Sequence, residues 1–350
     1  MDLWSGVSRS FDRLAERRLR GLPRGELPIE ARMSAFHEWG GHSLAYSAST
    51  QKGLEHFGDA QGFIAYGRLM GQAVALGDPV APEPARDALL GRFIEAAGAP
   101  SFAEVTPATA GLLAARGYRV MRMGVDSVLD LATYDFSGRR KETVRYSERW
   151  LAKNGYRIGE TAEFPEQAEA ILALSREWRE GRIVKRREMA FLNRPFPKRE
   201  EPLTRRFVLL SPENRPVSLL FFDPISRGGE VTGYLTAFKR RVADVTSHAE
   251  IGLTKHAVDR FKGEGRQTVT LGLSPLLDVK PSGFRESELF RKLVARLYAS
   301  PTVNRRVFNL QGHAAFKRRF HAREEPRFFA WKRGAPVMPF LALLRLSRAF

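Results

Sequence analysis

The chain contains no cysteine among its 350 residues. This absence excludes disulfides, thiolate zinc sites, iron–sulfur clusters and a cysteine nucleophile, and it favours a reducing compartment. Long hydrophobic runs are also missing, since the strongest ones, such as 218–222, are too short to cross a bilayer. Asp2 is not followed by the apolar segment of a secretory signal. We therefore expect a cytoplasmic protein, or one that is peripheral at the inner face of the cell membrane.

Acidic residues are scarce beside basic ones. The chain has 57 Lys and Arg against 39 Asp and Glu, which gives a formal charge of +18. The excess lies in three segments. Segment 139–157 has seven basic and two acidic residues, segment 176–206 has eleven and five, and segment 305–333 has nine and two. Charge localised in this way is typical of a surface that binds a polyanion, and three solvated faces are the alternative.

The first basic segment has a regular spacing. Four residues recur every four positions in a predicted helix over 139–154: Lys141, Arg145, Arg149 and Lys153. This spacing places them along one face, where like charges repel by a few tenths of a kcal/mol per pair. Bound phosphates would relieve the repulsion, so we predict that this face contacts a polyanion.

The order of predicted elements occurs twice along the chain. In the first half, strands are expected at 42–49, 63–69 and 73–76, followed by helix 84–97, strand 101–105, helix 107–116 and strand 118–131. In the second half, strands are expected at 206–210, 217–222 and 231–240, followed by helix 250–262, strand 268–273 and helix 286–298. Antiparallel strands, a helix, a strand and a second helix form the layout of a GNAT-type acyltransferase. The sequence thus predicts an α+β fold of tandem GNAT-like domains, with two mixed sheets flanked by helices.

This order divides the chain into five parts. We predict an N-terminal helix and linker at 1–32, a first GNAT-like lobe at 33–160, a connecting helix and basic loop at 161–205, a second lobe at 206–335 and an amphipathic tail at 336–350. The tail has two interpretations: it lies in a membrane interface, or it packs against the body.

Several familiar motifs are incomplete or lie in the wrong structural context in this sequence. His37 and His42 are one residue too far apart for a zincin helix, and the seven histidines show no metal-ligand spacing, so no metal site is expected. Segment 68–73 matches the pyrophosphate loop of acetyl-CoA enzymes but lies in a predicted hairpin, not between a strand and a helix. Ser274 lacks the closing glycine of a nucleophile elbow and is predicted to be structural or substrate-binding.

Three patches together resemble a known family. They are Phe63–Tyr66 with Ala75–Val80; Thr270–Leu276; and Phe308–Gly312 with Phe316-Lys317, Phe320 and Pro326–Phe328. Their order and spacing resemble the C-terminal catalytic domain of bacterial phosphatidylglycerol lysyltransferases, the aminoacyl-phosphatidylglycerol synthases. The resemblance covers about residues 35–333 and implies a tandem GNAT fold. We expect a form without the membrane-embedded flippase domain of full-length members.

The resemblance also implies a reaction. The family transfers an aminoacyl group from aminoacyl-tRNA to a lipid hydroxyl, and the donor ester is already activated. The protein must therefore position the tRNA end, accept a proton and stabilise an oxyanion, with no cofactor and no metal. The implied partners are aminoacyl-tRNA and an anionic phospholipid or membrane surface, and not duplex DNA. Lys141, Arg145, Arg149 and Lys153 are the predicted tRNA or anionic-surface contacts.

Candidate site residues follow from the same patches. Lys317 and Arg327 match basic positions of the third patch and are predicted to meet lipid or tRNA phosphate or the oxyanion. Arg318 and Arg319 are weaker candidates for substrate binding.

The acidic candidates are less clearly marked. Glu250 opens a predicted helix of the second half and is the candidate general base, with Asp259 and Asp278 as alternatives. Asp78 would either bind the aminoacyl ammonium or cap a turn before Pro79. Two other functions remain open: an acyl-CoA-dependent N- or O-acyltransferase of the same fold, and a non-catalytic basic module that binds RNA or a membrane. The amino acid and the acceptor are not determined by the sequence.

Overall fold

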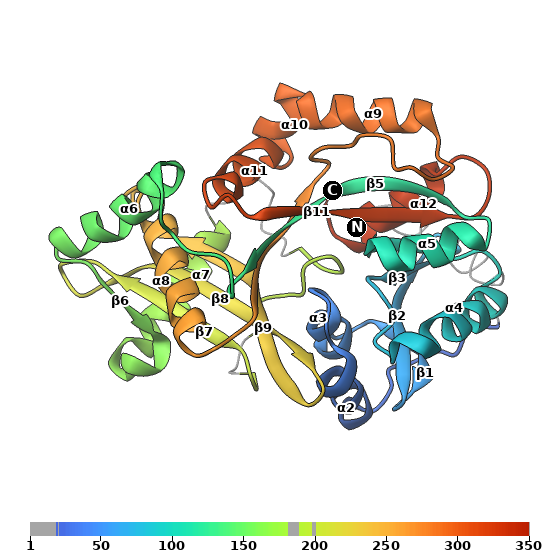
Figure 1. Ribbon diagram of the computed structural model, residues 1–350, viewed down its shortest axis with the longest axis horizontal. Helices are drawn as coiled ribbons and strands as arrows, with labels where there is room; N and C mark the ends of the chain where they lie inside the picture. The colour runs from blue at the N-terminus through green and yellow to red at the C-terminus, as the bar shows by residue number, and fades with distance from the viewer. Residues whose placement is uncertain (1–18, 20, 181–188, 198–200, 350) are drawn as a thin grey trace, which may run out of the picture.

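The protein is described here by a computed structural model that covers residues 19, 21–180, 189–197 and 201–349. Within these residues the strands form one mixed sheet of 11 strands in the order β1-β2-β3-β4-β11-β5-β10-β9-β8-β7-β6 (Figure 1). The predicted N-terminal helix and linker at 1–32 lie largely outside the described residues.

The elements of the first half follow one another along residues 29–160. They are α2 (Ile29–Trp39), α3 (Ala45–Thr50), β1 (Glu55–Asp59), β2 (Gly62–Leu69), β3 (Gln72–Leu76), α4 (Glu83–Ala97), β4 (Ser101–Val105), α5 (Pro107–Ala115), β5 (Arg119–Asp130), α6 (Glu142–Lys153) and β6 (Arg157–Glu160). The segment 42–49, predicted as a strand, is instead the helix α3 and its approach; its alanines and serines fit a buried helix as well as a strand.

The remaining elements run from residue 168 to residue 346. They are α7 (Ala168–Glu180), β7 (Arg205–Leu210), β8 (Pro216–Arg227), β9 (Glu230–Arg241), α8 (Ala249–Gly263), β10 (Thr268–Pro275), α9 (Glu288–Ala299), α10 (Pro301–Arg306), α11 (Leu310–Arg318), β11 (Arg323–Trp331) and α12 (Val337–Leu346).

The two halves share a short parallel strand pair at equivalent places. In the first half β3 pairs with β4 from Val74↔Ser101 to Leu76↔Ala103, and in the second half β9 pairs with β10 from Gly233↔Thr268 to Leu235↔Thr270. Each pairing covers three residues, after which the strands separate. The predicted duplication of element order is confirmed by this correspondence.

The two predicted sheets are joined into one. The last strand, β11, lies between β4 and β5 and is antiparallel to both, while β5 pairs with β10 of the second half. In Figure 1 the long strands β5 and β11 run side by side across the molecule. The C-terminal strand therefore completes the first half, and polar residues from both halves meet at this junction.

The packing of α6 and β6 differs from the predicted lobe boundary at residue 160. β6 pairs with β7, and Val144 and Leu151 of α6 are buried in the same hydrophobic cluster as residues of α8. Both elements thus pack with the second half, although they precede the predicted boundary.

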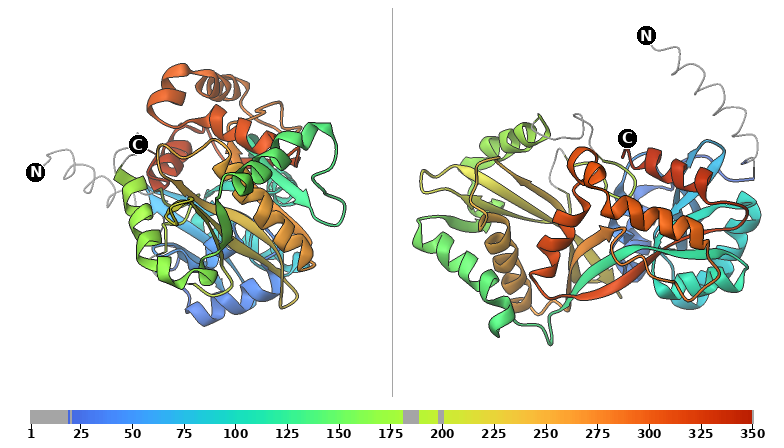
Figure 2. Two further views of the ribbon diagram at one scale, coloured as in Figure 1. Left: turned by 90° about the vertical axis from the view of Figure 1, so that its left-hand side faces the viewer. Right: turned by 90° about the horizontal axis from the view of Figure 1, so that it is seen from above.

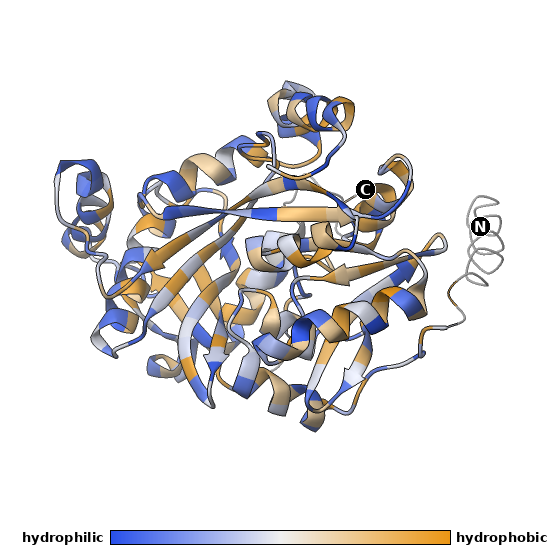
Figure 3. Ribbon diagram, turned by 45° about the vertical axis from the view of Figure 1, so that its right-hand side comes forward, coloured by the Kyte–Doolittle hydropathy of each residue, from blue (hydrophilic) through white to orange (hydrophobic). Residues whose placement is uncertain are grey.

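Helices cover both faces of the sheet, as Figure 2 shows from two further directions. On β2, Phe63 and Ala65 belong to the cluster under α2, α3 and α12, whereas Ile64 and Tyr66 belong to the cluster under α4 and α5. Successive strand residues point to opposite faces, so a continuous apolar strand is buried twice. Figure 3 shows these hydrophobic stretches along the strands.

The C-terminal tail packs against the body. Phe340 and Leu343 of α12 are buried, and the Phe340 ring meets Phe290 of α9 with 5.2 Å between ring centroids. Of the two interpretations of residues 336–350, the structure thus shows the packed one. Among the described helices, none has the length and apolar character needed to cross a membrane.

Candidate functional site

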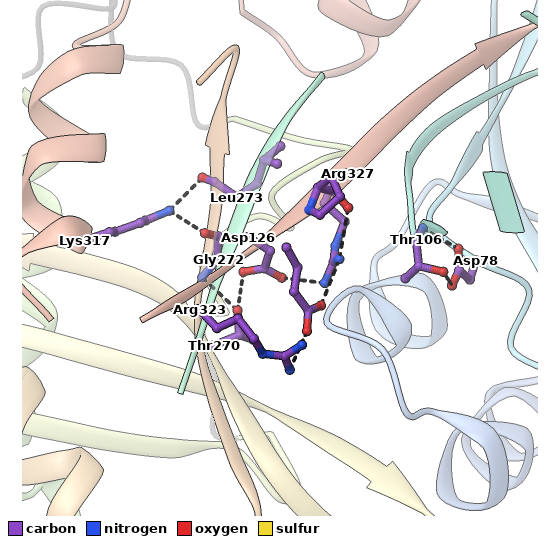
Figure 4. Close-up of polar contacts among 11 residues, drawn as sticks. Asp78, Thr106, Asp126, Thr270, Gly272, Leu273, Lys317, Arg323 and Arg327 are labelled. Carbon is purple, nitrogen blue, oxygen red and sulfur yellow. Dashed lines mark hydrogen bonds and ion pairs between the residues drawn. The ribbon is translucent and has the colours of Figure 1, made fainter. Parts of the chain in front are cut away.

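A buried ion pair joins the two strands at the junction. Asp126 of β5 is fully buried, and its Oδ2 lies 3.1 Å from a terminal nitrogen of Arg327 on β11 (Figure 4). Burial disfavours the charge of Arg327, but the neighbouring carboxylates of Asp126, Glu325 and Glu104 hold its pKa above the ordinary value. Arg327, predicted from the family resemblance, is thus a permanent buried cation facing an acid that the sequence reasoning did not find.

A chain of hydrogen bonds extends from Asp126 into β10. The Thr270 hydroxyl donates to Oδ1 of Asp126, and the Gly272 N–H donates to the Thr270 hydroxyl at 3.2 Å. Between Thr270 and Leu273 the pairing of β10 with β5 shifts register. Gly272 takes a φ of +79° in this bulge, a left-handed conformation that glycine adopts without steric cost.

Lys317 of α11 reaches this bulge. Its Nζ donates to the carbonyl oxygens of Gly272 and Leu273, each at 2.7 Å (Figure 4). Burial lowers the pKa of Lys317 to about 8, against the opposing effect of Asp126 and Glu104. A predicted site residue is therefore brought to the same centre as Arg327, with an ammonium that can lose its proton near neutral pH.

A cavity opens beside Lys317. It has a volume of about 250 Å³ and is lined by Ser127, Lys317, Arg318, His321, Ala322 and Glu324. Ser127 follows Asp126 on β5, so the two side chains point to opposite faces of the sheet. Two basic side chains, Lys317 and Arg318, outnumber the one acid, Glu324, in this lining, which favours an anionic substrate.

Two further titratable groups, the buried Glu104 and the half-buried His42, lie near the centre. Glu104, at the end of β4, is 6% exposed, and burial together with the charge of Asp126 raises its pKa to about 8. Burial also lowers the pKa of His42 to about 4, although nearby Asp78 opposes this effect. Charged or polar residues inside the apolar strand patterns of 101–105 and 119–130 were the available sequence signal for Glu104 and Asp126.

Asp78 is a capping residue in this structure. Its Oδ1 accepts from the Thr106 N–H at 2.9 Å, and its Oδ2 accepts from the Thr106 hydroxyl at 2.6 Å (Figure 4). Both carboxylate oxygens hold the start of α5, so the structural alternative for Asp78 is the one the geometry favours.

The other predicted site residues lie around the centre. Glu250 sits in the first turn of α8, half-buried, 3.8 Å from Arg241 and outside the network of Asp126. Arg318 pairs with Glu324 at 2.9 Å, and Arg319 is exposed at the end of α11. Ser274 is 1% exposed, and its hydroxyl has no hydrogen-bond partner among the described residues.

The alternative acids for the general base already carry lysine partners. Asp259 lies 2.5 Å from Lys255, and Asp278 lies 2.8 Å from Lys280. Neither is drawn into the hydrogen bonds around Asp126.

The predicted basic face of α6 is only partly free. Lys141 precedes the helix and donates to the Asp135 carbonyl, while Arg145 donates to the carbonyls of Phe136 and Gly138. These two side chains fix the loop before the helix. Arg149 and Lys153 are exposed.

The segment that resembled a pyrophosphate loop has a structural role. Residues 68–73 form the turn between β2 and β3, as predicted, and Arg68 donates to the carbonyls of Leu19 and Leu22 at 3.2 and 3.1 Å. The backbone amides of this turn belong to a hairpin rather than to a helix N-terminus.

Comparison with known proteins identifies the family. Residues 34–331 match the family model described as "Phosphatidylglycerol lysyltransferase, C-terminal". A curated phosphatidylglycerol lysyltransferase of Bacillus subtilis (strain 168) is 21% identical over 344 residues, which are 94% of this chain and 38% of that protein. The chain thus spans less than half the length of this relative.

Solved structures show the same fold. The C-terminal domain of a putative lysylphosphatidylglycerol synthetase from Agrobacterium fabrum matches with a TM-score of 0.72 and 20% identity, covering 92% of this chain and 98% of that one. L-PGS from Bacillus licheniformis matches with a TM-score of 0.73 and 19% identity, covering 93% and 99%. The match of the family model over most of the sequence shows that the chain belongs to the phosphatidylglycerol lysyltransferase C-terminal domain family.

Proposed function

We propose that the protein transfers an aminoacyl group from aminoacyl-tRNA to a hydroxyl of phosphatidylglycerol at the cytoplasmic face of the membrane. The observation that carries the proposal is the buried centre of Asp126, Arg327 and Lys317 beside a basic cavity of about 250 Å³. The family match and the name of the Bacillus subtilis relative supply the substrate class.

The proposed reaction is an ester exchange. The lipid hydroxyl oxygen attacks the carbonyl carbon of the aminoacyl ester, a new C–O bond forms, and the bond to the tRNA ribose oxygen breaks. The proton of the lipid hydroxyl ends on the ribose oxygen that leaves. In this proposal Arg327 and Lys317 stabilise the oxyanion that develops in between, because buried cations act strongly where water is excluded.

The general base of this reaction stays a proposal for Glu250. Its carboxylate lies near Lys239, whose pKa burial lowers to about 7; Glu250 opposes this effect and Lys317 reinforces it. Lys239 Nζ also lies 3.3 Å from the centre of the Phe316 ring, on the helix that carries Lys317. A proton accepted at Glu250 would therefore remain close to the oxyanion centre.

Reconstitution tests this function. Purified protein is mixed with phosphatidylglycerol vesicles and tRNA charged with labelled lysine or alanine, and label in extracted lipid is counted. We expect labelled lipid that disappears when RNase is added first. Asp126→Asn should lower the rate by on the order of 10²-fold, whereas Glu95→Gln on the exposed surface of α4 should not. A lack of labelled lipid with every aminoacyl-tRNA, or product that RNase leaves unchanged, would refute the proposal.

A further inference from the structure

Helix α9 presents two leucines to solvent. Leu289 is 82% exposed and Leu293 is 49% exposed, although a surface helix normally turns such side chains towards the core. Lys292 and Arg296 are exposed as well, and the spacing of the four residues at i, i+3, i+4 and i+7 places them along one side of the helix. We call these four residues the outer stripe of α9. Apolar and cationic side chains alternate along it.

The opposite side of α9 already holds the helix on the body. Phe290 and Val294 are buried in the hydrophobic cluster that contains Phe340, and Ser287 caps the helix by accepting from the Phe290 N–H at 3.4 Å. Neither leucine of the outer stripe belongs to a hydrophobic cluster of the described residues. The outer stripe is therefore available to a partner without any change in the packing of α9.

The surface around the outer stripe is basic. Residues 288–306, which include α9 and α10, contain five basic side chains and one acidic side chain. That acid, Glu288, is paired with Lys292 at 2.8 Å. Arg305 and Arg306 are exposed at the end of α10, and neither forms an ion pair within the described part of the chain. The partner that fits this surface is both anionic and apolar.

Helix α12 extends the same kind of surface. The rings of Phe340 on α12 and Phe290 on α9 are in contact, and both helices are visible when the molecule is seen from above in the right panel of Figure 2. Val337 and Met338 in the first turn of α12 are exposed, as is Arg333 shortly before it. Exposed apolar and basic residues thus occur on two neighbouring helices.

We propose that the outer stripe of α9, together with the first turn of α12, docks on an anionic lipid bilayer. Leucines enter the boundary between headgroups and acyl chains, while lysine and arginine stay among the lipid phosphates, as in helices that lie in a membrane interface. The choice of phospholipid as the partner rests on the proposed function. A tRNA backbone would neutralise the cations but leave the leucines in water, and a second copy would bring like charges together.

The outer stripe is linked to the transfer centre through three successive helices. Tyr298, in the last turn of α9, packs in a small cluster with Ala314 of α11. The side chain of Asn304 on α10 donates to the Tyr298 carbonyl at 2.8 Å and accepts from the Gln311 N–H of α11 at 2.9 Å. Helix α11 carries Lys317, which lines the cavity. Docking through α9 thus brings the helix that lines the cavity close to the lipid.

Vesicle flotation with the purified protein tests the docking. Vesicles contain phosphatidylglycerol and phosphatidylcholine, or phosphatidylcholine alone, and we expect the wild type to float mainly with the anionic ones. Leu289→Gln with Leu293→Gln should weaken this binding on the order of tenfold or more, because the apolar contact is lost. Arg305→Gln with Arg306→Gln should weaken it by about fivefold for each cation, and its binding should depend less on salt.

Matched controls change the same residue types elsewhere on the surface. Leu172→Gln with Leu203→Gln replaces two exposed leucines of the second half, and Lys52→Gln with Arg92→Gln removes two exposed cations of the first half. Both controls should bind anionic vesicles as the wild type does. Equal loss of binding in the α9 variant and the leucine control, or wild-type binding in the α9 variant, would overturn the proposal.

The absence of cysteine allows the contact to be located directly. Leu293→Cys supplies a single thiol for a nitrobenzoxadiazole dye, whose emission shifts to the blue when it leaves water. We expect this shift on addition of anionic vesicles, and quenching by lipids with a nitroxide on the acyl chain. The same dye at Leu172→Cys should show neither effect. Unchanged emission at position 293 while the protein floats with the vesicles would show that another face binds, and would refute the assignment.

Docking and transfer can fail separately. If the wild type forms aminoacyl lipid and Leu289→Gln with Leu293→Gln does so with unchanged KM for vesicle phosphatidylglycerol, docking through α9 is refuted and the function stands. If the protein docks as described but no aminoacyl-tRNA yields labelled lipid, the docking stands and the proposed function is refuted. A leucine variant that loses tRNA affinity but keeps vesicle binding would assign the outer stripe to tRNA and overturn the proposal.

Discussion

At the residue scale, the buried Glu104 lowers the free energy of unfolding at neutral pH because its pKa is raised. Burial and Asp126 raise its pKa from 4.5 to about 8, so the native state binds a proton that the unfolded state releases near pH 4.5. The stabilising effect of this proton is complete below pH 4.5 and is lost as the pH rises from there to about 8. A glutamate that costs stability at neutral pH points to chemistry, and not to packing, as the reason for its presence.

Glu104→Gln should therefore change the pH dependence of stability. We expect its free energy of unfolding to exceed that of the wild type by on the order of 2 kcal/mol at pH 8, with the difference shrinking towards pH 5. Urea unfolding at several pH values measures this. A variant less stable than the wild type at pH 8 would show that the carboxyl is ionised and satisfied in the native state.

Arg327, unlike Glu104, should stabilise the native state, because its charge balances the buried carboxylate of Asp126. Arg327→Met leaves Asp126 without its partner, and we expect a loss of about 3–5 kcal/mol in the free energy of unfolding. The double variant Asp126→Asn with Arg327→Met removes both charges and should recover part of that loss. Denaturant unfolding of the two single variants and the double variant gives the coupling energy; independent effects would contradict a direct ion pair.

At the element scale, the bulge of β10 positions Lys317. Gly272 has φ +79°, and a Cβ there would lie 3.4 Å from a Leu235 methyl carbon and 3.9 Å from Lys317 Nζ. Gly265 has a similar φ of +73° with no atom within 4 Å of such a Cβ. Substituting each glycine in turn therefore distinguishes the energetic cost of a left-handed backbone from an effect on the position of Lys317.

Gly272→Ala and Gly265→Ala should each lower the free energy of unfolding by about 1–2 kcal/mol, because both glycines hold a left-handed backbone conformation that alanine avoids. Only Gly272→Ala should also lower the rate of aminoacyl transfer, since a backbone shift that relieves its left-handed φ would move the Gly272 carbonyl that accepts from Lys317 Nζ. Thermal or urea unfolding and the vesicle assay measure the two effects. Equal transfer rates in both variants would show that the bulge at Gly272 is not required for catalysis.

Local sequence patterns were sufficient to predict most elements. Proline near the start and glycine at the end located α4, and the apolar runs located β5, β8 and β10. Segment 42–49 was wrongly predicted as a strand because small residues such as Ala45 and Ser47 have no decisive periodicity in a buried helix.

The site was predictable only in part. Lys317 and Arg327 were found through motifs, but their partners depend on pairings between distant segments. Asp126 meets Arg327 only because β11 inserts beside β5, 201 positions away along the chain. Glu104 becomes a site residue through burial and a left-handed backbone, neither of which local composition determines.

At the scale of the whole molecule, the shared sheet should make the two halves unfold together. β11 completes the first half, β5 pairs with β10 of the second half, and removing either half would expose long strand edges. We expect urea transitions followed by far-UV circular dichroism and by tryptophan fluorescence to coincide, with Trp331 in the first half and Trp150 in the second. Two separated transitions would show that the halves are independent folding units.

The exposed basic residues of α6 are expected to contribute to tRNA binding through phosphate contacts. Arg149 and Lys153 are the exposed residues of the basic face of α6, whereas Lys141 and Arg145 hold the preceding loop. The double variant Arg149→Glu with Lys153→Glu should bind tRNA more weakly at low salt. The slope of log affinity against log salt concentration should fall in magnitude by about 0.7–0.9 for each phosphate that the variant no longer neutralises.

A matched control distinguishes a tRNA contact from a general effect of net charge. Lys52→Glu with Arg92→Glu alters the same number of charges at exposed positions of the first half. If α6 contacts tRNA, this control keeps the salt slope of the wild type, because phosphate contacts are local while net charge acts at long range and is screened. Equal loss of affinity in both double variants would mean that tRNA responds only to the overall charge of +18, and the basic face of α6 would then have no specific role in tRNA binding.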